Sequence, residues 1–290
     1  SIDGSGDIFI QNEVDRIEYE INKRKKELRF NTSLNISKNP FEIDLLNYKK
    51  NENSDLRLKF QGKSNTKQVL TLDEFSLTEK NNIISIKNLI ISNNNKINDL
   101  GNININYIDK ENLKNDLQIK KKDKDYLVSG NSFNIDRIID KLLNSENKKK
   151  SELFDNDFKF IFNIKKIFLN KENNINNLKG FLSINKNKIS KLNLESKFSN
   201  QKSIKLTISN NGDEKITTLF SDEAKPLVSR YKFIKGFEEG NLDFYSIKKN
   251  DITNSTLKID NFKIQEIPAL AKLLTLASLQ GIADLLTGEG

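Results

Sequence analysis

Hydrophobic and polar residues alternate in short runs along most of the chain. The clearest runs occupy residues 17–21, 56–60, 103–107, 158–164, 192–194 and 204–208. A period of two places successive side chains on opposite faces of a β-sheet, so each run would be apolar on one face only. The pattern therefore predicts many half-buried β-strands.

Short polar turns separate the runs in the second half of the chain. They include residues 185–188, 200–202 and 210–212, and the last of these ends in Asn211-Gly212. Asn-Gly favours the two-residue turns of β-hairpins, because glycine tolerates positive φ and asparagine does so better than most residues. Turns this short leave no room for crossover helices, so residues 158–220 are predicted to form an antiparallel meander.

Two shorter segments carry helical signals. In residues 132–144 the isoleucines and leucines recur at helical spacing on one face, and Ser132 is suited to the N-cap. A further helical turn is expected within residues 222–231, with Pro226 near its start.

The segment from Ile267 to Thr287 is apolar nearly all round when it is placed at helical spacing. Pro268 suits the first turn of a helix and Gly288 suits the residue just past the last turn. One lysine, one glutamine and one aspartate interrupt the segment, which argues against a membrane span. Such a helix must be covered by protein or lipid. One of its faces would carry Leu270, Leu273, Leu274, Ala277 and Leu285.

These elements together predict a mainly β fold. We expect an elongated antiparallel meander that forms a curved sheet or open groove, with two or three short helices including the apolar one at the C-terminal end. The charged segment 144–151 would divide the chain into a β-rich unit over residues 1–150 and a β-meander unit over residues 151–290, unless one continuous groove spans both. The apolar face must be hidden against a second sheet, helices or a ligand, and periodicity does not choose between a closed sandwich and an open groove.

Composition narrows the chemistry that the chain can perform. The chain contains no Cys, His, Met or Trp. Without imidazole or thiolate groups it can form neither a Ser-His or Cys-His nucleophile nor an ordinary zinc site. Carboxylate pairs such as Asp155 and Asp157 lie in loop-like surroundings, with nothing to raise a carboxyl pKa. We therefore expect no enzyme activity, no catalytic residues, no metal and no cofactor.

The net charge of +8 does not by itself indicate a nucleic-acid partner. The lysines are spread among Asn, Ile, Asp and Glu along the whole length, and only three short basic runs occur. Diffuse charge is typical of a solvated surface, whereas nucleic-acid binding requires lysines gathered against phosphates. The start of the chain has neither a basic nor an apolar leader, and we expect it to be an internal piece of a longer protein.

The C-terminal part carries a resemblance to a known family. A strand ending in Leu257-Lys-Ile-Asp-Asn-Phe262 is followed by Pro268-Ala-Leu-Ala-Lys-Leu-Leu274, by Ala277-Ser-Leu-Gln-Gly-Ile282 and by Leu285-Leu-Thr-Gly-Glu-Gly290. This order resembles the signature of the AsmA-like C-terminal family of Gram-negative bacteria. Residues 222–231 and 235–244 look like the stretch that precedes this helix in the family. The first 150 residues share with the family only alternating strands and an amphipathic helix.

The resemblance implies an envelope protein that is anchored in the inner membrane outside this fragment. Such proteins extend through the periplasm as a β-rich groove and are regarded as bridge-like carriers of phospholipid toward the outer membrane. The expected partners are phospholipid acyl chains, the membranes at the ends of the full-length protein and other envelope proteins. No catalytic motif is carried over from the family. The helix of residues 267–287 would mark the last part of the groove, where it would pack along or cap the apolar face, or touch a membrane at one end.

A lipid track would be formed by the inward-facing residues of the predicted strands. The candidates are Ile103, Ile105, Phe158, Phe160, Phe162, Leu192, Leu194, Ile204, Leu206 and Ile208. The same residues would form an ordinary core if the protein were instead a structural or scaffolding envelope protein, with a closed β-sandwich that binds protein rather than lipid. Lys191, Asn193 and Lys205 would point outward in either case.

Overall fold

The computed structural model of the protein describes residues 1–143, 153–185, 187–229, 236–250 and 252–264. The chain divides into two compact units. Unit 1 comprises residues 1–137 and 151–157, and unit 2 comprises residues 138–150 and 158–290.

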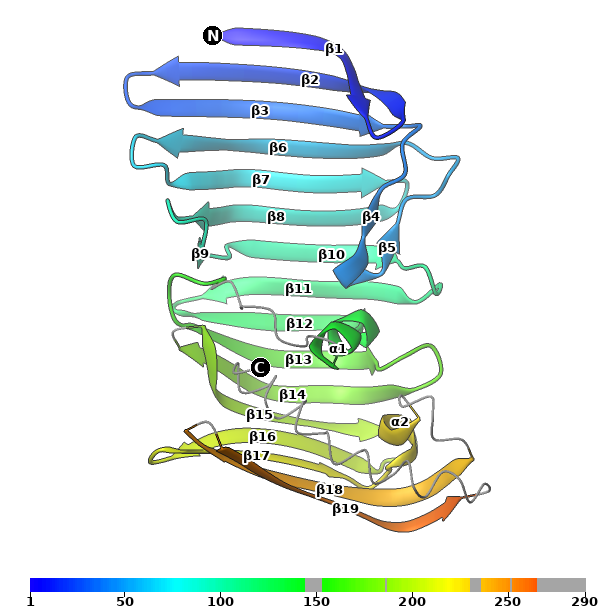
Figure 1. The fold of residues 1–290 in the computed structure, drawn as a ribbon. Coiled ribbons are helices and arrows are strands. Elements are labelled where there is room, and N and C mark those ends of the chain that lie inside the picture. Colours follow the sequence, from blue (N-terminus) through cyan, green and yellow to red (C-terminus); the bar gives the residue numbers. More distant parts are fainter. Residues whose placement is uncertain (144–152, 186, 230–235, 251, 265–290) are drawn as a thin grey trace. The chain divides into compact units, whose positions relative to one another are not determined.

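Unit 1 is built on one antiparallel sheet (Figure 1). Its main strands are β1 (Ile2–Ile10), β2 (Glu13–Arg24), β3 (Glu27–Ile36), β6 (Leu56–Asn65), β7 (Leu70–Glu79), β8 (Asn82–Ile91), β10 (Asn102–Ile108), β11 (Lys114–Lys122) and β12 (Asp125–Asn134). Each of these strands pairs with the next one in this order, and the short β9 (Ile97–Asp99) also pairs with β8. Among the described residues of unit 1, β1 and β12 do not pair with each other, so this sheet is open.

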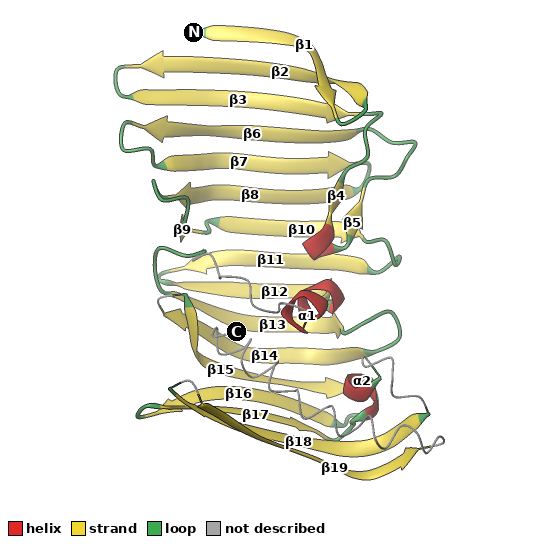
Figure 2. Cartoon of the chain, viewed as in Figure 1, coloured by secondary structure: helices red, strands yellow, loops and turns green. Residues whose placement is uncertain are grey.

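A small second layer lies against the sheet of unit 1. It contains β4 (Glu42–Ile43), a 3₁₀ turn (Asp44–Leu46) and β5 (Tyr48–Lys49), and β4 pairs only with β5 among the described strands. Figure 2 shows this segment in front of one end of the strands. It belongs to the connection between β3 and β6, residues 37–55, which we call the cap segment.

Unit 2 is an antiparallel meander. Its strands are β13 (Phe158–Phe168), β14 (Asn174–Asn185), β15 (Lys188–Phe198), β16 (Ser203–Asn211), β17 (Glu214–Ser221), β18 (Phe237–Lys249) and β19 (Ile252–Ile264). Each strand pairs with its neighbour in sequence. The Asn211–Glu214 pair closes a two-residue hairpin turn in which Gly212 has a φ of 60°. The meander and the hairpin predicted from the turn residues are both confirmed.

The helical predictions are partly confirmed. Helix α1 (Asp136–Leu143) begins four residues later than the predicted segment, because β12 continues to Asn134. Ser132 therefore is not the N-cap, and its hydroxyl donates to the carbonyl oxygen of Lys114 at 2.6 Å. The side-chain oxygen of Asn134 instead accepts a hydrogen bond from the backbone N–H of Asp136 at 3.0 Å.

The second short helix, α2 (Lys225–Val228), carries Pro226 in its first turn, as the sequence predicts. Val228 and the preceding Ala224 are buried with Phe237, Leu242 and Phe244 of β18.

The helix predicted for residues 267–287 lies outside the described residues. Among the residues that are described, no helix is long and apolar enough to cross a membrane.

Candidate functional site

The registers of unit 1 gather the apolar positions of its strands on one face. One row of cross-strand partners runs from Ile17 on β2 to Leu117 on β11 and is apolar on every strand between them. A second row runs from Tyr19 to Ile119, interrupted only by Thr32. Because side chains alternate between faces, this arrangement follows from the period-two pattern once the registers are aligned.

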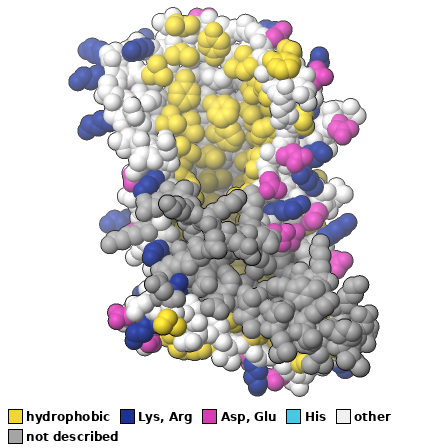
Figure 3. All heavy atoms as spheres, viewed as in Figure 1, with side chains coloured by type: hydrophobic (Ala, Val, Ile, Leu, Met, Phe, Trp, Pro, Cys, Tyr) yellow, Lys and Arg dark blue, Asp and Glu magenta, His cyan; other side chains and the backbone are white. Residues whose placement is uncertain are grey.

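Part of this face remains accessible. We call this part the apolar strip, and all of its side chains are half-buried or exposed. Its members are Tyr19, Ile21, Phe30, Phe60, Leu72, Phe75, Ile86, Leu89, Ile103 and Ile119. Tyr19 is 37% exposed, and the rings of Phe60 and Phe75 lie 5.1 Å apart between centroids. Figure 3 shows the hydrophobic side chains of this face as a continuous area in the upper part of the view.

The opposite face of the same sheet is polar. Lys59 and Gln61 flank Phe60 along β6, and the register pairs Lys59 with Ser33 on β3 and with Ser76 on β7. The sheet of unit 1 is therefore amphipathic, with water as the natural environment of one face only.

The cap segment covers the apolar face at one end of the strands. Tyr48 is fully buried, and its ring meets that of Tyr107 edge-on at 5.6 Å. The Tyr107 hydroxyl donates to the carbonyl oxygen of Leu46 at 2.5 Å. Leu56 and Leu77, near the same end of their strands, are also fully buried. This end is an ordinary core, whereas the apolar strip is not.

A buried carboxylate attaches the cap segment to the sheet. Glu79, the last residue of β7, is fully buried and accepts hydrogen bonds from the Tyr48 hydroxyl at 2.7 Å and the Asn51 backbone N–H at 2.7 Å. Ser54 and Asn82 also donate to it. Burial alone would raise the pKa of Glu79, but the bonds from Ser54, Tyr48 and Asn51 outweigh it and lower the pKa to about 2. Burial, and then the hydrogen bond to the same carboxylate, raise the pKa of Tyr48 well above its usual range.

A second buried carboxylate fixes the start of the cap segment. Asp15 accepts hydrogen bonds from the backbone N–H of Ser37 at 2.8 Å and from the Asn39 side chain at 2.8 Å. Burial would raise the pKa of Asp15, and these bonds more than offset it, so the pKa is lowered. A third, Asp109, holds the turn between β10 and β11 through Asn134 and the backbone of Glu111. Sequence reasoning missed all three residues.

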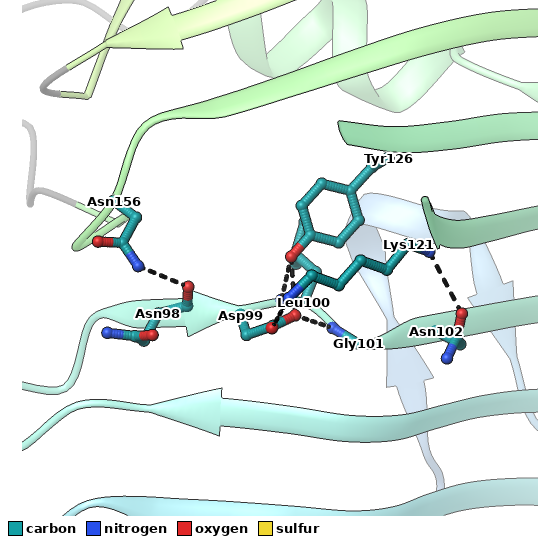
Figure 4. Close-up of polar contacts among 8 residues, drawn as sticks. All are labelled: Asn98, Asp99, Leu100, Gly101, Asn102, Lys121, Tyr126 and Asn156. Carbon is teal, nitrogen blue, oxygen red and sulfur yellow. Dashed lines mark hydrogen bonds and ion pairs between the residues drawn. The ribbon is translucent and has the colours of Figure 1, made fainter. Parts of the chain in front are cut away.

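A polar cluster lies at the other end of the strands (Figure 4). Asp99 accepts hydrogen bonds from the Tyr126 hydroxyl at 2.7 Å and from the backbone N–H of Gly101 at 2.8 Å, and it forms an ion pair with Lys121. Burial and the bond to Asp99 raise the pKa of Tyr126 to about 12. Asn156 donates to the carbonyl oxygen of Asn98 at 3.0 Å. These contacts hold the turn before β10 in place.

The carboxylates described above act as structural groups. Each accepts several hydrogen bonds from fixed donors. For Glu79, Asp15 and Asp99 these bonds stabilise the ionised form and lower the pKa, which leaves the three carboxylates poorly suited to proton transfer near neutral pH. Among the described residues, no group of three or more His, Cys, Asp or Glu side chains is placed to hold a metal ion.

The structure places the predicted lipid-track residues on the apolar faces of their own units. Ile103 belongs to the apolar strip, and Ile105 is buried beside it in the row that also contains Ile84 and Leu117. In unit 2 the registers bring the remaining eight together on one face. These are Phe158, Phe160, Phe162, Leu192, Leu194, Ile204, Leu206 and Ile208.

The apolar face of unit 2 contains both buried and accessible positions. Phe158, Leu192 and Ile208 are buried, whereas Phe162 and Leu194 are half-buried. The predicted outward positions Lys191, Asn193 and Lys205 alternate with these residues and so lie on the opposite face. The predicted capping residues Leu270, Leu273, Leu274, Ala277 and Leu285 lie outside the described residues.

Comparisons with models of protein families, with curated proteins and with solved structures gave no match for this chain.

Proposed function

We propose that this chain is a non-enzymatic carrier of phospholipid, in which the apolar faces of the two β units shelter acyl chains from water. The proposal places the chain within a larger AsmA-like protein of the Gram-negative envelope, anchored in the inner membrane and working in the periplasm between the two membranes. The family and the location rest on the resemblance of the C-terminal segment alone. The lipid-carrying activity has independent support from the shape of unit 1.

The partly accessible apolar strip is the observation that carries the proposal. A sheet face lined by phenylalanine and isoleucine normally packs against a second layer, yet among the described residues of unit 1 the second layer covers only one end of the strands. Each CH₂ group brought out of water gains roughly 0.8 kcal/mol. An acyl chain lying on the strip would therefore remove both its own CH₂ groups and the apolar side chains of the strip from water.

The dimensions of the strip suit an acyl chain. It crosses β2, β3, β6, β7, β8, β10 and β11. Neighbouring strands are about 4.8 Å apart, so the strip extends roughly 29 Å across the strands. One leaflet contributes about half of the 30 Å hydrocarbon core of a bilayer, so an acyl chain fits within this length.

Lipid retained by the purified chain tests the proposal directly. We expect residues 1–290, expressed in a Gram-negative host and purified without detergent, to carry phospholipid that mass spectrometry of the native protein detects. A monodisperse, folded preparation that contains no lipid, and takes none up from vesicles, would contradict the proposal.

Photo-crosslinking locates the bound lipid. A crosslinking amino acid at Phe60, Ile103 or Leu194 should give lipid adducts, because these side chains line the apolar faces. The matched controls are Gln61, Asn102 and Asn193, one residue away in each strand and on the opposite face. Adducts at the controls alone would refute the proposed track.

The alternative is a structural envelope protein that binds other proteins. The described strands of unit 1 form one open sheet with a small cap rather than two packed sheets, which is unlike the sandwich core expected for that role. Protein adducts without lipid adducts at Phe60 and Ile103 would favour the alternative.

A further inference from the structure

The two ends of the strands in unit 1 differ in charge. Successive turns of an antiparallel meander lie at alternate ends, so residues 23–27, 63–69, 92–101 and 120–125 share one end, which we call the basic rim. The basic rim carries eleven lysine and arginine residues and four acidic ones. At the other end, residues 10–15, 37–55, 79–82 and 108–114 carry six basic and nine acidic residues. We call this end the capped rim.

The charges of the basic rim are mostly uncompensated. Lys23, Lys25, Lys26 and Lys67 are exposed, and within the described part of the chain their side chains make no ion pair or hydrogen bond. Lys121 and Lys63 are paired, with Asp99 and with Glu27, and Lys96 is not counted among the free lysines. Figure 3 shows basic side chains along the left margin of the apolar face.

Three lysines of the capped rim have partners within the protein. Lys110 and Lys49 both pair with Glu42, at 2.6 and 3.6 Å. Lys50 is buried and donates to the carbonyl oxygen of Ser37 at 2.8 Å. Lys38 and Lys80 are exposed, but acidic residues outnumber basic ones on the capped rim, so this rim offers a ligand no net positive charge.

The basic rim directly borders the apolar strip. Lys23 lies two residues after Ile21 on the same face of β2, where it pairs across the sheet with Leu28. Lys25 and Lys26 form the turn that follows. A ligand on the strip would thus meet apolar side chains along its length and free ammonium groups at one side only.

We infer that the ligand of unit 1 is an anionic phospholipid, whose acyl chains lie on the apolar strip and whose phosphate-bearing headgroup is held at the basic rim. The inference rests on the proposed function and adds the class and orientation of the lipid. Ammonium groups and phosphates attract each other strongly where few counter-charges intervene. A zwitterionic headgroup offers no net charge to this rim and is held less well.

A competition between two lipids tests the inference. The purified chain is incubated with vesicles of equal parts phosphatidylglycerol and phosphatidylcholine, the vesicles are removed by flotation, and mass spectrometry counts both lipids on the soluble protein. We expect about tenfold enrichment of phosphatidylglycerol, since several lysines lie near the headgroup. The variant K23Q/K25Q/K26Q should lose most of this enrichment and still retain lipid. The matched variant K38Q/K49Q/K80Q, on the capped rim, should behave as the wild type.

Each other outcome counts against the inference in a distinct way. Retention of both lipids in equal amounts, or enrichment that survives in K23Q/K25Q/K26Q, would overturn the inference and leave the proposed function intact. Retention of neither lipid would overturn both. Protein that floats with the anionic vesicles while the soluble fraction holds no lipid would identify the basic rim as a membrane-docking surface instead.

Discussion

At the scale of single residues, Glu79 shows how a buried charge holds the cap segment on the sheet. Its pKa of about 2 lies below the ordinary value of about 4.3. A lowered carboxyl pKa stabilises the folded state above the ordinary pKa, and this contribution disappears as the pH falls toward the folded pKa. The wild type should therefore lose roughly 3 kcal/mol of unfolding free energy from this group between about pH 5 and 2.

Urea unfolding of wild type and Glu79→Gln at several pH values checks this prediction. At pH 7 the variant should be less stable by about 1 to 3 kcal/mol, because an amide cannot accept all of the hydrogen bonds that the carboxylate accepts. The difference should shrink at pH 3. Glu74→Gln, which removes a partly exposed ion pair with Lys59, is the control and should cost less than about 1 kcal/mol. A constant difference between Glu79→Gln and wild type over this pH range would show that the charge is unimportant.

The polar residues of the capped rim could have been noticed in the sequence, but their role could not. Glu79 continues the apolar phase of Phe75 and Leu77, and Asp15 likewise precedes Ile17 and Tyr19 in phase. A charged residue at an apolar position near a strand end signals a buried polar contact. Most hydrogen-bond donors to Glu79 and Asp15 come from residues 37–55. The position of that segment depends on the tertiary structure.

At the scale of elements, the strand pairing requires a close backbone approach at Gly62. A Cβ atom there would lie 2.2 Å from the carbonyl oxygen of Thr71, at the irregularity between β6 and β7. Gly62→Ala should therefore destabilise unit 1 by about 1 to 3 kcal/mol in urea unfolding, because backbone atoms must move. Gly6→Ala, where nothing lies within 4 Å, is the matched control and should be nearly neutral. Equal effects of the two substitutions would contradict this account.

Period-two patterning and short turns predicted the strands well, since both are local properties of the sequence. The start of α1 was misplaced because Ser132 looks like an N-cap, whereas its pairing with β11 keeps it in β12. The cap segment was not predicted. Residues 37–55 have no regular period, and they are held by contacts with distant residues such as Glu79 and Tyr107. Tertiary contacts of this kind override local propensity.

At the scale of the whole molecule, the sequence predicted which side chains share a face within each strand. It did not predict which of those positions would be covered. Leu77 and Phe60 have the same pattern around them, yet Leu77 lies in the fully buried part of the face and Phe60 lies in the apolar strip. The difference in burial comes from the cap segment. Residues under the cap segment are needed for stability, whereas residues outside it are available to a ligand.

Two substitutions on this face should therefore affect different properties, one the stability of the protein and the other its lipid retention. Leu77→Ala should lower the unfolding free energy by about 2 to 5 kcal/mol, as expected for a buried leucine. Phe60→Ser should cost the lipid-free protein less than Leu77→Ala, about 2 kcal/mol, because the Phe60 ring is only partly buried. It should nevertheless reduce the phospholipid retained per protein molecule, measured by mass spectrometry after equal exposure to vesicles. If Phe60→Ser were as destabilising as Leu77→Ala and left lipid retention unchanged, the apolar strip would be part of the folding core rather than a surface for acyl chains.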